Sequence, residues 1–321
     1  MEKDGSFKNI DINLNDKKQI NDETITNVIW GIWDYHQPMK LEGSSLSIKG
    51  YSIAALRTNF FIPELGILLD AGLSAPYSNL NHIFITHGHS DHCANIPFHI
   101  YGAKLSGTKL QVHVPEESVN YIDQFITYGY CISSHPDSNI PKNELYVNNY
   151  YEMQARKTGD IIDLKIKGFN YYTEVIECYH SIPCVGYGFY EVRKKLKDEY
   201  LNLSGKEIGN LKKQNIEINK DVNYYHFVFL GDTSKKIFEN KEILKYKTII
   251  IECTFISDDD YDQAEKTFHI HWKDLLPFVL ENKENNFILI HFSQRYKRSE
   301  IIQFFESEME KNQIKNIHAW I

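Results

Sequence analysis

The sequence is poor in several features that mark particular classes of protein. Its five cysteines are odd in number, widely spaced and without a CxxC pair, which argues against a disulfide framework and predicts reduced, buried thiols. No apolar run approaches the roughly 18 to 20 residues that a membrane-spanning helix requires. The first 25 residues also lack the apolar core of a signal peptide. We therefore expect an intracellular, cytoplasmic protein that has no membrane partner. The nucleus and an organelle are the alternative locations.

Positive charge is also scarce. The chain has 35 Lys and Arg residues against 43 Asp and Glu residues, a formal net charge of −8. Nucleic acids usually bind a basic surface, so an RNA substrate would require a local basic patch on this protein. In other respects the composition, 42% hydrophobic and 24% charged, is that of a folded globular protein.

Two regions differ in patterning along the chain. Residues 1–40 are polar and rich in Asn, Asp and Lys, which predicts a loosely ordered N-terminal extension. Residues 41–321 contain short apolar runs bounded by glycine or polar clusters, the pattern of buried strands. These runs cover residues 66–72, 82–88, 110–115, 226–232, 248–254 and 287–293.

Helical patterns lie between the apolar runs. Examples are residues 116–128 and 297–311; in the second, Ile301, Ile302 and Phe305 share one face and are expected in the core. Alternating strands and helices predict a layered α/β domain.

Candidate metal ligands follow the apolar runs. Side chains at the ends of rigid strands are held in fixed positions, which suits a catalytic site. The motif THGHSDH is too dense in histidine to be a chance feature. The candidates are His87, His89, Asp91 and His92 within this motif, and Asp70, Asp232 and His291 at the ends of three other runs.

The spacing in THGHSDH predicts a site for two metal ions. Two histidines at positions i and i+2 of a turn can converge on one ion, while the adjacent Asp and His face a second. Imidazole and carboxylate ligands without cysteine suit Zn²⁺, Mn²⁺ or Fe²⁺. Two such ions can share a bridging carboxylate and ionise water near neutral pH, so no serine or cysteine nucleophile is needed. The alternative is a single structural zinc site, although such sites usually include cysteine.

These motifs also carry a family resemblance. THGHSDH, with LLDAG before it and GDT and IHFSQRY after it, resembles the metallo-β-lactamase fold, and more closely the ribonuclease Z family of tRNA 3′-processing endonucleases. The resemblance spans about residues 43–321. Two further segments of this chain, ECYHSIPCVGYGFYE (177–191) and ECTF (252–255), are similar to signatures of the family. Residues 195–212 are similar to a segment of the short, plant-type enzymes. The resemblance implies an α/β, four-layer αβ/βα sandwich of two mixed sheets with outer helices.

The resemblance further implies two divalent metal ions per chain, with zinc favoured and manganese or iron possible. Asp232 would bridge the two ions, and Asp70 would orient ligands through hydrogen bonds. Asp91 is counted among the catalytic residues as well as the ligands. The implied ligands are His87, His89 and His180 for the first ion, and Asp91, His92 and His291 for the second.

A general acid for the leaving 3′ oxygen is implied by the same resemblance. AEKTFHIHW (264–272) is similar to a family element ending in histidine, which assigns the proton donor to His269 and its orienting carboxylate to Glu252. His271, two residues further along, is the rival donor.

Substrate capture is predicted from local charge. Residues 191–220 hold eight Lys or Arg residues against five acidic ones, and the resemblance implies an arm-like insertion over about 191–222 that grips tRNA. A solvated charged helix is the alternative. The chain lacks the Gly-Pro-rich tip of bacterial family members, having no proline from 184 to 276. The predicted contacts in this segment are Arg193, Lys194, Lys195, Lys197, Lys212 and Lys213. Ser293 and Arg295, which lie beside the candidate ligand His291, are also predicted to contact the substrate, Arg295 through a phosphate. A structural ion pair is the equal alternative for Arg295.

The predicted function is a metal-dependent phosphodiesterase. As an endonuclease of the family that the chain resembles, it would remove the 3′ trailer of precursor tRNA by attack of metal-bound hydroxide, leaving a 3′-hydroxyl on the tRNA and a 5′-phosphate on the trailer. One alternative is a small-molecule or cyclic-nucleotide phosphodiesterase of the same fold. Another is a non-catalytic RNA-binding subunit with a relic site. The resemblance also implies a homodimer.

Overall fold

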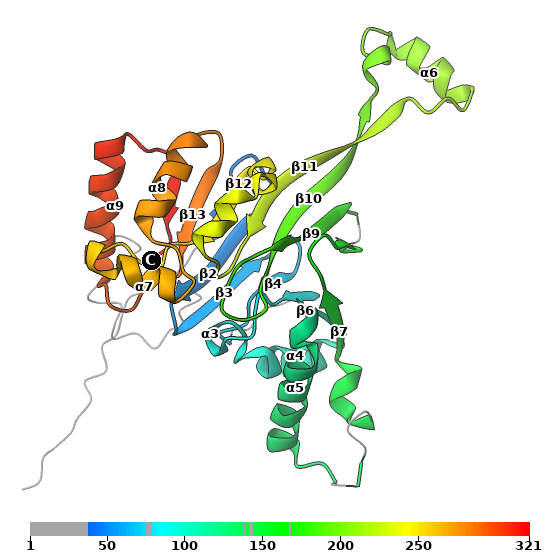
Figure 1. Cartoon of the computed structure of the whole chain (residues 1–321). Coiled ribbons are helices and arrows are strands. Elements are labelled where there is room, and N and C mark those ends of the chain that lie inside the picture. Colours follow the sequence, from blue (N-terminus) through cyan, green and yellow to red (C-terminus); the bar gives the residue numbers. More distant parts are fainter. Residues whose placement is uncertain (1–37, 75–78, 138, 141–143, 167) are drawn as a thin grey trace, which may run out of the picture. The chain divides into compact units, whose positions relative to one another are not determined.

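Two seven-stranded mixed sheets organise the residues that the structure, a computed structural model, describes (Figure 1). These are residues 38–321 except 75–78, 138, 141–143 and 167, and Pro38–Ile321 form one compact unit. The predicted extension over residues 1–40 lies almost wholly outside the described residues, and it stays a prediction.

The first sheet follows the chain order from β1 to β7. Its strands are antiparallel from β1 to β4 and parallel from β4 to β7. Helices α4 (Ile96–Ser106) and α5 (Val119–Ser134) pack on its outer face. The strands are β1 (Met39–Lys40), β2 (Ser47–Ile53), β3 (Arg57–Ile62), β4 (Ile67–Leu69), β5 (His82–Phe84), β6 (Leu110–Pro115) and β7 (Tyr151–Arg156).

The second sheet has the order β14-β13-β12-β11-β10-β9-β8. Strands β8 to β11 pair antiparallel, and β11 to β14 pair parallel. Its outer face is covered by α8 (Trp272–Glu281) and α9 (Arg298–Asn312). The strands are β8 (Ile161–Asp163), β9 (Tyr171–Glu177), β10 (Val185–Leu196), β11 (Asn219–Phe229), β12 (Thr248–Glu252), β13 (Asn286–Ile290) and β14 (Ile317–Ala319).

The apolar core forms three layers of contact. The central cluster joins the inner faces of both sheets, for example Phe60 of β3 with Phe229 of β11 at 5.9 Å between ring centroids. Two outer clusters join each sheet to its helices. Every residue of β12 and β13 is buried, as expected of parallel strands covered on both faces. The predicted four-layer α/β sandwich is confirmed.

The predicted strands correspond to β4, β5, β6, β11, β12 and β13. The predicted helices correspond to α5, which begins after a short turn η1 (Glu116–Ser118), and α9. Ile301 and Phe305 lie in the core, but Ile302 is 37% exposed, so its assignment to the core was wrong: the buried face of α9 is narrower than the apolar pattern indicated. All five cysteines are free, with Cys131 and Cys184 only half-buried.

A projecting hairpin (residues 190–225) extends strands β10 and β11 beyond the second sheet (Figure 1). The register shifts once, between Phe189 and Tyr190, and then pairs the strands to Leu196 and Asn219. The tip carries η4 (Asp198–Tyr200) and α6 (Gly205–Lys213). Ser204 and Glu207 form a reciprocal capping box that begins α6.

Candidate metal centre and active site

Several strands end at the same place, and their following residues converge there. Asp70 follows β4, Asp232 lies three residues after β11, and His291 follows β13. Helix α3 (Ser90–Cys93), which begins shortly after β5, carries Asp91 and His92. Because β4 and β5 run parallel, as do β11, β12 and β13, their carboxyl ends lie at common sheet edges.

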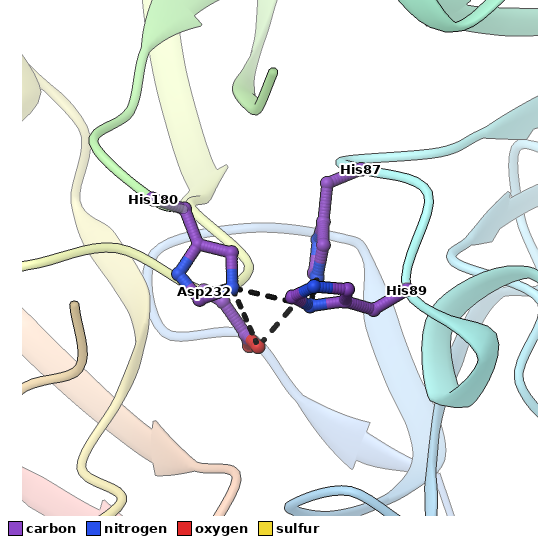
Figure 2. Close-up of side chains that lie close together, drawn as sticks. All are labelled: His87, His89, His180 and Asp232. Atoms are coloured by element: carbon purple, nitrogen blue, oxygen red, sulfur yellow. Dashed lines mark hydrogen bonds and ion pairs between the residues drawn. The ribbon is translucent and has the colours of Figure 1, made fainter. Parts of the chain in front are cut away.

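The first group of donors consists of three imidazoles and one carboxylate (Figure 2). The Nδ1 atom of His89 lies 3.1 Å from Nε2 of His87 and 3.2 Å from Nε2 of His180. Oδ2 of Asp232 lies 3.7 Å from His87 Nε2 and 3.9 Å from His180 Nε2. One ligand atom from each residue lies within 4.8 Å of all the others, so the four side chains enclose a space of ionic size.

The second group joins α3 to the end of β13. Nε2 of His291 lies 3.4 Å from Nε2 of His92 and 3.4 Å from Oδ2 of Asp91. Asp91 Oδ2 is also 3.5 Å from His92 Nε2. These three residues therefore present one carboxylate and two imidazole donors to a common point.

Asp232 lies between the two groups. Its Oδ2 faces the first group, while its Oδ1 is 3.4 Å from Nε2 of both His92 and His291. Within the described residues this buried Oδ1 has no hydrogen-bond partner. A buried carboxylate oxygen without a hydrogen bond is costly unless a cation satisfies it. The donors thus fit divalent metal ions on both sides of Asp232.

Buried oxygens hold the ring orientation of these histidines. His92 Nδ1 donates to Asp70 Oδ2 at 2.7 Å, and Asp70 in turn accepts from Thr86 N at 2.8 Å. His291 Nδ1 and Thr254 Oγ1 are 3.0 Å apart. In each case the Nδ1 contact leaves Nε2 directed into the cluster, an arrangement typical of histidine ligands. Burial lowers the pKa of His87 well below its ordinary value, which favours the neutral imidazole that can bind a metal.

A histidine–carboxylate pair lies next to the cluster. His269 Nδ1 is 2.7 Å from Oε1 of Glu252, whose side chain is fully buried at the end of β12. The His269 ring stacks near His291 at 5.4 Å between centroids. Burial lowers the pKa of His269, but the charge and hydrogen bond of Glu252 outweigh it and raise the pKa to about 9. The imidazole is therefore protonated at neutral pH.

A groove of about 730 Å³ opens onto both metal-ligand groups and onto His269. The groove is lined by both basic and acidic side chains and is open to solvent, and a hydrolytic site requires both properties.

Curated proteins similar to this chain are tRNA-processing nucleases. The tRNase Z TRZ1 of Arabidopsis thaliana is 30% identical over 270 residues, which cover 82% of this chain and 90% of that protein. The chain belongs to the ribonuclease Z family. The chloroplastic tRNase Z TRZ2 of the same plant is 27% identical over 267 residues, covering 81% of this chain and 71% of that protein. The ribonuclease Z of Methanococcus maripaludis is 28% identical over 271 residues, covering 75% and 80%.

Solved structures confirm the fold. The metallo-β-lactamase fold protein YhfI of Bacillus subtilis superposes with a TM-score of 0.52 at 11% identity, over 86% of this chain and 95% of that one. No protein-family model matches the chain.

The relatives do not favour the small-molecule phosphodiesterase alternative. One of them is chloroplastic, so ribonuclease Z membership does not assign a compartment, and the intracellular location stays a prediction. Among the described residues, no helix is long and apolar enough to cross a membrane.

In this ribonuclease Z family member, His271 has a structural environment that differs from that of His269. Its ring is buried, Nε2 donates to the Ser257 carbonyl at 2.8 Å, and Nδ1 accepts from Lys273 N at 3.0 Å. Both nitrogens are therefore occupied, and the residue caps the N-terminus of α8. This geometry favours His269 over its rival as a proton donor.

Six of the predicted substrate contacts, all of them Lys or Arg residues between positions 193 and 213, lie on the projecting hairpin. Several of them are paired with acids there: Arg193 with Glu191, and Lys194 with Asp221 at 3.0 Å. Lys197 precedes η4 and is half-buried. Within the described residues, ion-pair partners are absent for Lys195, Lys212 and Lys213, which are all exposed. The positive charge available to a phosphate backbone is thus smaller than the residue count indicates.

Ser293 and Arg295 line the central groove beside His291. The Arg295 guanidinium forms an ion pair with Asp260 and lies over the Phe255 ring at 5.6 Å. The Arg295 side chain is still half-exposed. Arg295 was predicted either to contact a phosphate or to form a structural ion pair, and the contact with Asp260 supports the ion pair.

Two neighbours of the site were not identified from the sequence. Thr254 bridges Glu252 and His291, and its only signal was its place in ECTF. The second is the backbone carbonyl of Phe268, which accepts from His180 Nδ1 at 3.2 Å. A backbone contact of this kind leaves no signal in residue types.

Proposed function

We propose that this chain is a metal-dependent endonuclease that removes the 3′ trailer of precursor tRNA, leaving a 3′-hydroxyl on the tRNA and a 5′-phosphate on the trailer. The observation that carries the proposal is Asp232, whose two oxygens face two separate groups of histidine donors beside the Glu252–His269 pair. Similarity to proteins named tRNase Z supports the substrate.

We further propose two metal ions per chain. His87, His89 and His180 would hold the first, and Asp91, His92 and His291 the second, with Asp232 between them. Nitrogen and carboxylate donors without a thiolate suit zinc, with manganese or iron as alternatives. Bound there, divalent ions supply Lewis acidity and ionise water near neutral pH.

The chain's own residues would handle the leaving group. His269 donates the proton on Nε2 to the departing 3′ oxygen, because its Nδ1 is already engaged with Glu252. Glu252 is itself held by the backbone N–H groups of Thr233 and Ile270, at 3.0 and 3.1 Å. The acid therefore needs no rearrangement before transfer.

Substrate capture would use the projecting hairpin as the arm-like insertion. Its unpaired Lys195, Lys212 and Lys213 are available to RNA phosphates. Electrostatic contacts of this sort depend on salt rather than on sequence.

The direct test is incubation of the protein with a precursor tRNA carrying a 3′ trailer, at low salt with Zn²⁺ or Mn²⁺, followed by mapping of both new ends. We expect one cut after the last tRNA nucleotide with a 3′-hydroxyl. Efficient turnover of bis(p-nitrophenyl) phosphate without that cut would instead favour the small-molecule phosphodiesterase. Metal analysis showing fewer than one ion per chain would favour the relic site.

A homodimer is the remaining part of this proposal. Helix α5 exposes Tyr121, Phe125, Tyr128 and Ile132, which recur at helical spacing along one face. A continuous apolar stripe of this kind is typical of an interface with another subunit. Light scattering should give the mass of two chains, and Tyr121→Glu with Ile132→Glu should halve it, whereas Ile161→Glu on exposed β8 should not. A monomeric wild-type protein would contradict the proposal.

A further inference from the structure

Phe268 is an exposed aromatic residue at the edge of the active site. Its side chain is 47% exposed although it immediately precedes His269 in the chain. Within the described part of the chain, no aromatic ring or cation packs against its ring in the way that Arg295 covers Phe255. Single exposed rings are common on protein surfaces, so the position of Phe268 beside His269, and not its exposure alone, is what suggests a ligand.

The backbone holds this ring in an unusual conformation. Phe268 has a φ of +58°, which is rare for a bulky residue. Its N–H donates to Glu265 O at 3.3 Å, and its carbonyl accepts from His180 Nδ1. A glycine would adopt this turn at lower cost, so the backbone contacts alone do not explain a phenylalanine.

Two grooves meet at Phe268. One, of about 820 Å³, runs past His180 towards Lys157, and the other, of about 450 Å³, includes His269. Both are also lined by Ser234 and Lys236. The Nζ atom of Lys236 lies 4.1 Å from the centroid of the Tyr179 ring, so a cation is positioned near the same junction. An apolar ring beside a lysine suits a nucleotide, whose base is flat and whose phosphate is anionic.

We propose that the Phe268 ring stacks on the base of the RNA nucleotide whose 3′ oxygen leaves, with Lys236 close to the phosphate on its 5′ side. The assignment to this nucleotide follows from the position of His269. The donor protonates the 3′ oxygen, and Phe268 both precedes this donor in the chain and lines the same groove of about 450 Å³. The inference rests on the proposed function and names a positioning residue for it.

Stacking would allow the site to accept different bases at its cutting position. Every base presents a flat face to an aromatic ring, so stacking orders the nucleotide without reading its hydrogen-bonding edge. It would also position the 3′ oxygen against His269, because the base, ribose and oxygen belong to one nucleotide.

The test uses two substitutions of Phe268. Phe268→Asn removes the ring but retains a residue that tolerates the left-handed conformation, and Phe268→Trp retains a stacking surface. Phe169→Asn is the matched control, because Phe169 is 50% exposed just before β9, at the end of that strand away from His180. We expect Phe268→Asn to lower kcat/KM for precursor tRNA by about 5- to 150-fold, the range of base–aromatic stacking, with Phe268→Trp near wild type.

A second measurement distinguishes stacking from a structural role. Precursor tRNAs are prepared with an abasic ribose either at the nucleotide before the cut or at the one after it. The abasic site before the cut should slow the wild-type enzyme as much as Phe268→Asn does, and should cost Phe268→Asn nothing further. Additive losses, or a coupling with the nucleotide after the cut, would overturn the inference.

Failure of the inference and failure of the proposed function give different results. If the wild-type protein does not cut precursor tRNA, the proposed function is wrong whatever Phe268 does. If the wild-type protein cuts correctly and Phe268→Asn has unchanged kinetics, only the stacking inference is wrong. Metal content of each variant should equal that of the wild type, because Phe268 contributes only its backbone to His180.

Discussion

Glu252 and His269 form a hydrogen bond of 2.7 Å between Oε1 and Nδ1, although one ends strand β12 and the other follows helix α7 (Tyr261–Lys266). The carboxylate also accepts hydrogen bonds from two backbone N–H groups and from the Thr254 hydroxyl. A buried carboxylate with so many donors is fixed in position beside the imidazole. His269 is therefore both oriented and charged before any substrate arrives.

Replacing His269 by alanine should slow cleavage of precursor tRNA by about 10²- to 10⁴-fold, the usual contribution of a positioned acid. Metal content, measured by mass spectrometry of the purified protein, should not change, because the two proposed donor groups are complete without His269, although its ring also lies within ligand distance of Asp232 and His291. His318→Ala, on the exposed side of β14, is the control and should be silent. A large loss of metal in His269→Ala would show that this residue is a ligand rather than the acid.

Asp232→Ala should remove most of the bound metal and abolish activity. The reason is that this one carboxylate faces both donor groups, so its loss weakens both sites together. Metal analysis and thermal unfolding should be measured on the same samples. Retention of two ions per chain by a folded Asp232→Ala protein would contradict the bridging position.

Shortening the projecting hairpin should separate RNA binding from chemistry. Residues 197–218 can be replaced by an Asn-Gly turn, because Leu196 and Asn219 are already paired. We expect KM for precursor tRNA to rise at least about tenfold and its salt dependence to weaken, since phosphate contacts are lost. Turnover of bis(p-nitrophenyl) phosphate should be unaffected. Equal losses on both substrates would show that the tip supports the fold instead.

Stability should fall below neutral pH partly because of His99 on α4. Burial lowers the pKa of His99 to about 4, and its Nε2 donates to the Leu73 carbonyl at 3.1 Å. As the pH falls below 6.5, the ordinary pKa of histidine, His99 becomes protonated in the unfolded chain but stays neutral in the folded chain. The free energy of unfolding should then drop by up to about 1.4 kcal/mol per pH unit until pH approaches 4.

Urea unfolding of wild-type protein and His99→Gln at pH 5 and pH 7.5 tests this effect. Glutamine retains a hydrogen-bond donor but does not titrate, so the variant should lose less stability between the two values. Identical pH dependence in both proteins would exclude His99 as a source.

The proposed metal ligands could be selected from the sequence where a simple pattern precedes them. His87, Asp232 and His291 each come just after a continuous apolar run, and such runs become buried strands with aligned ends. His180 follows β9, in which buried and partly buried residues alternate over the first five positions, so no continuous apolar run precedes it. Its assignment depended on the family resemblance.

Contacts across elements were not predictable from one sequence. The pairing of Lys194 with Asp221 depends on the register of β10 and β11, which the chain does not display locally. The charge count therefore overstated the free positive charge. In contrast, Ser204 and Glu207 have the local spacing of a capping box, which marks the start of α6. The prediction for this segment was drawn from its charges and did not use that spacing.

The register of the projecting hairpin constrains how this protein can diversify. Strand β11 ends at Phe229, three residues before Asp232, and its register against β10 shifts once, where Phe189 faces Phe227 and Tyr190 faces Tyr225. Insertion or loss of a single residue between this shift and Asp232 would turn the side chains that follow to the opposite face and displace that carboxylate. Changes made in matched numbers on both strands would leave it in place. The tip beyond the register shift can thus be lengthened, shortened or exchanged while Asp232 keeps its position.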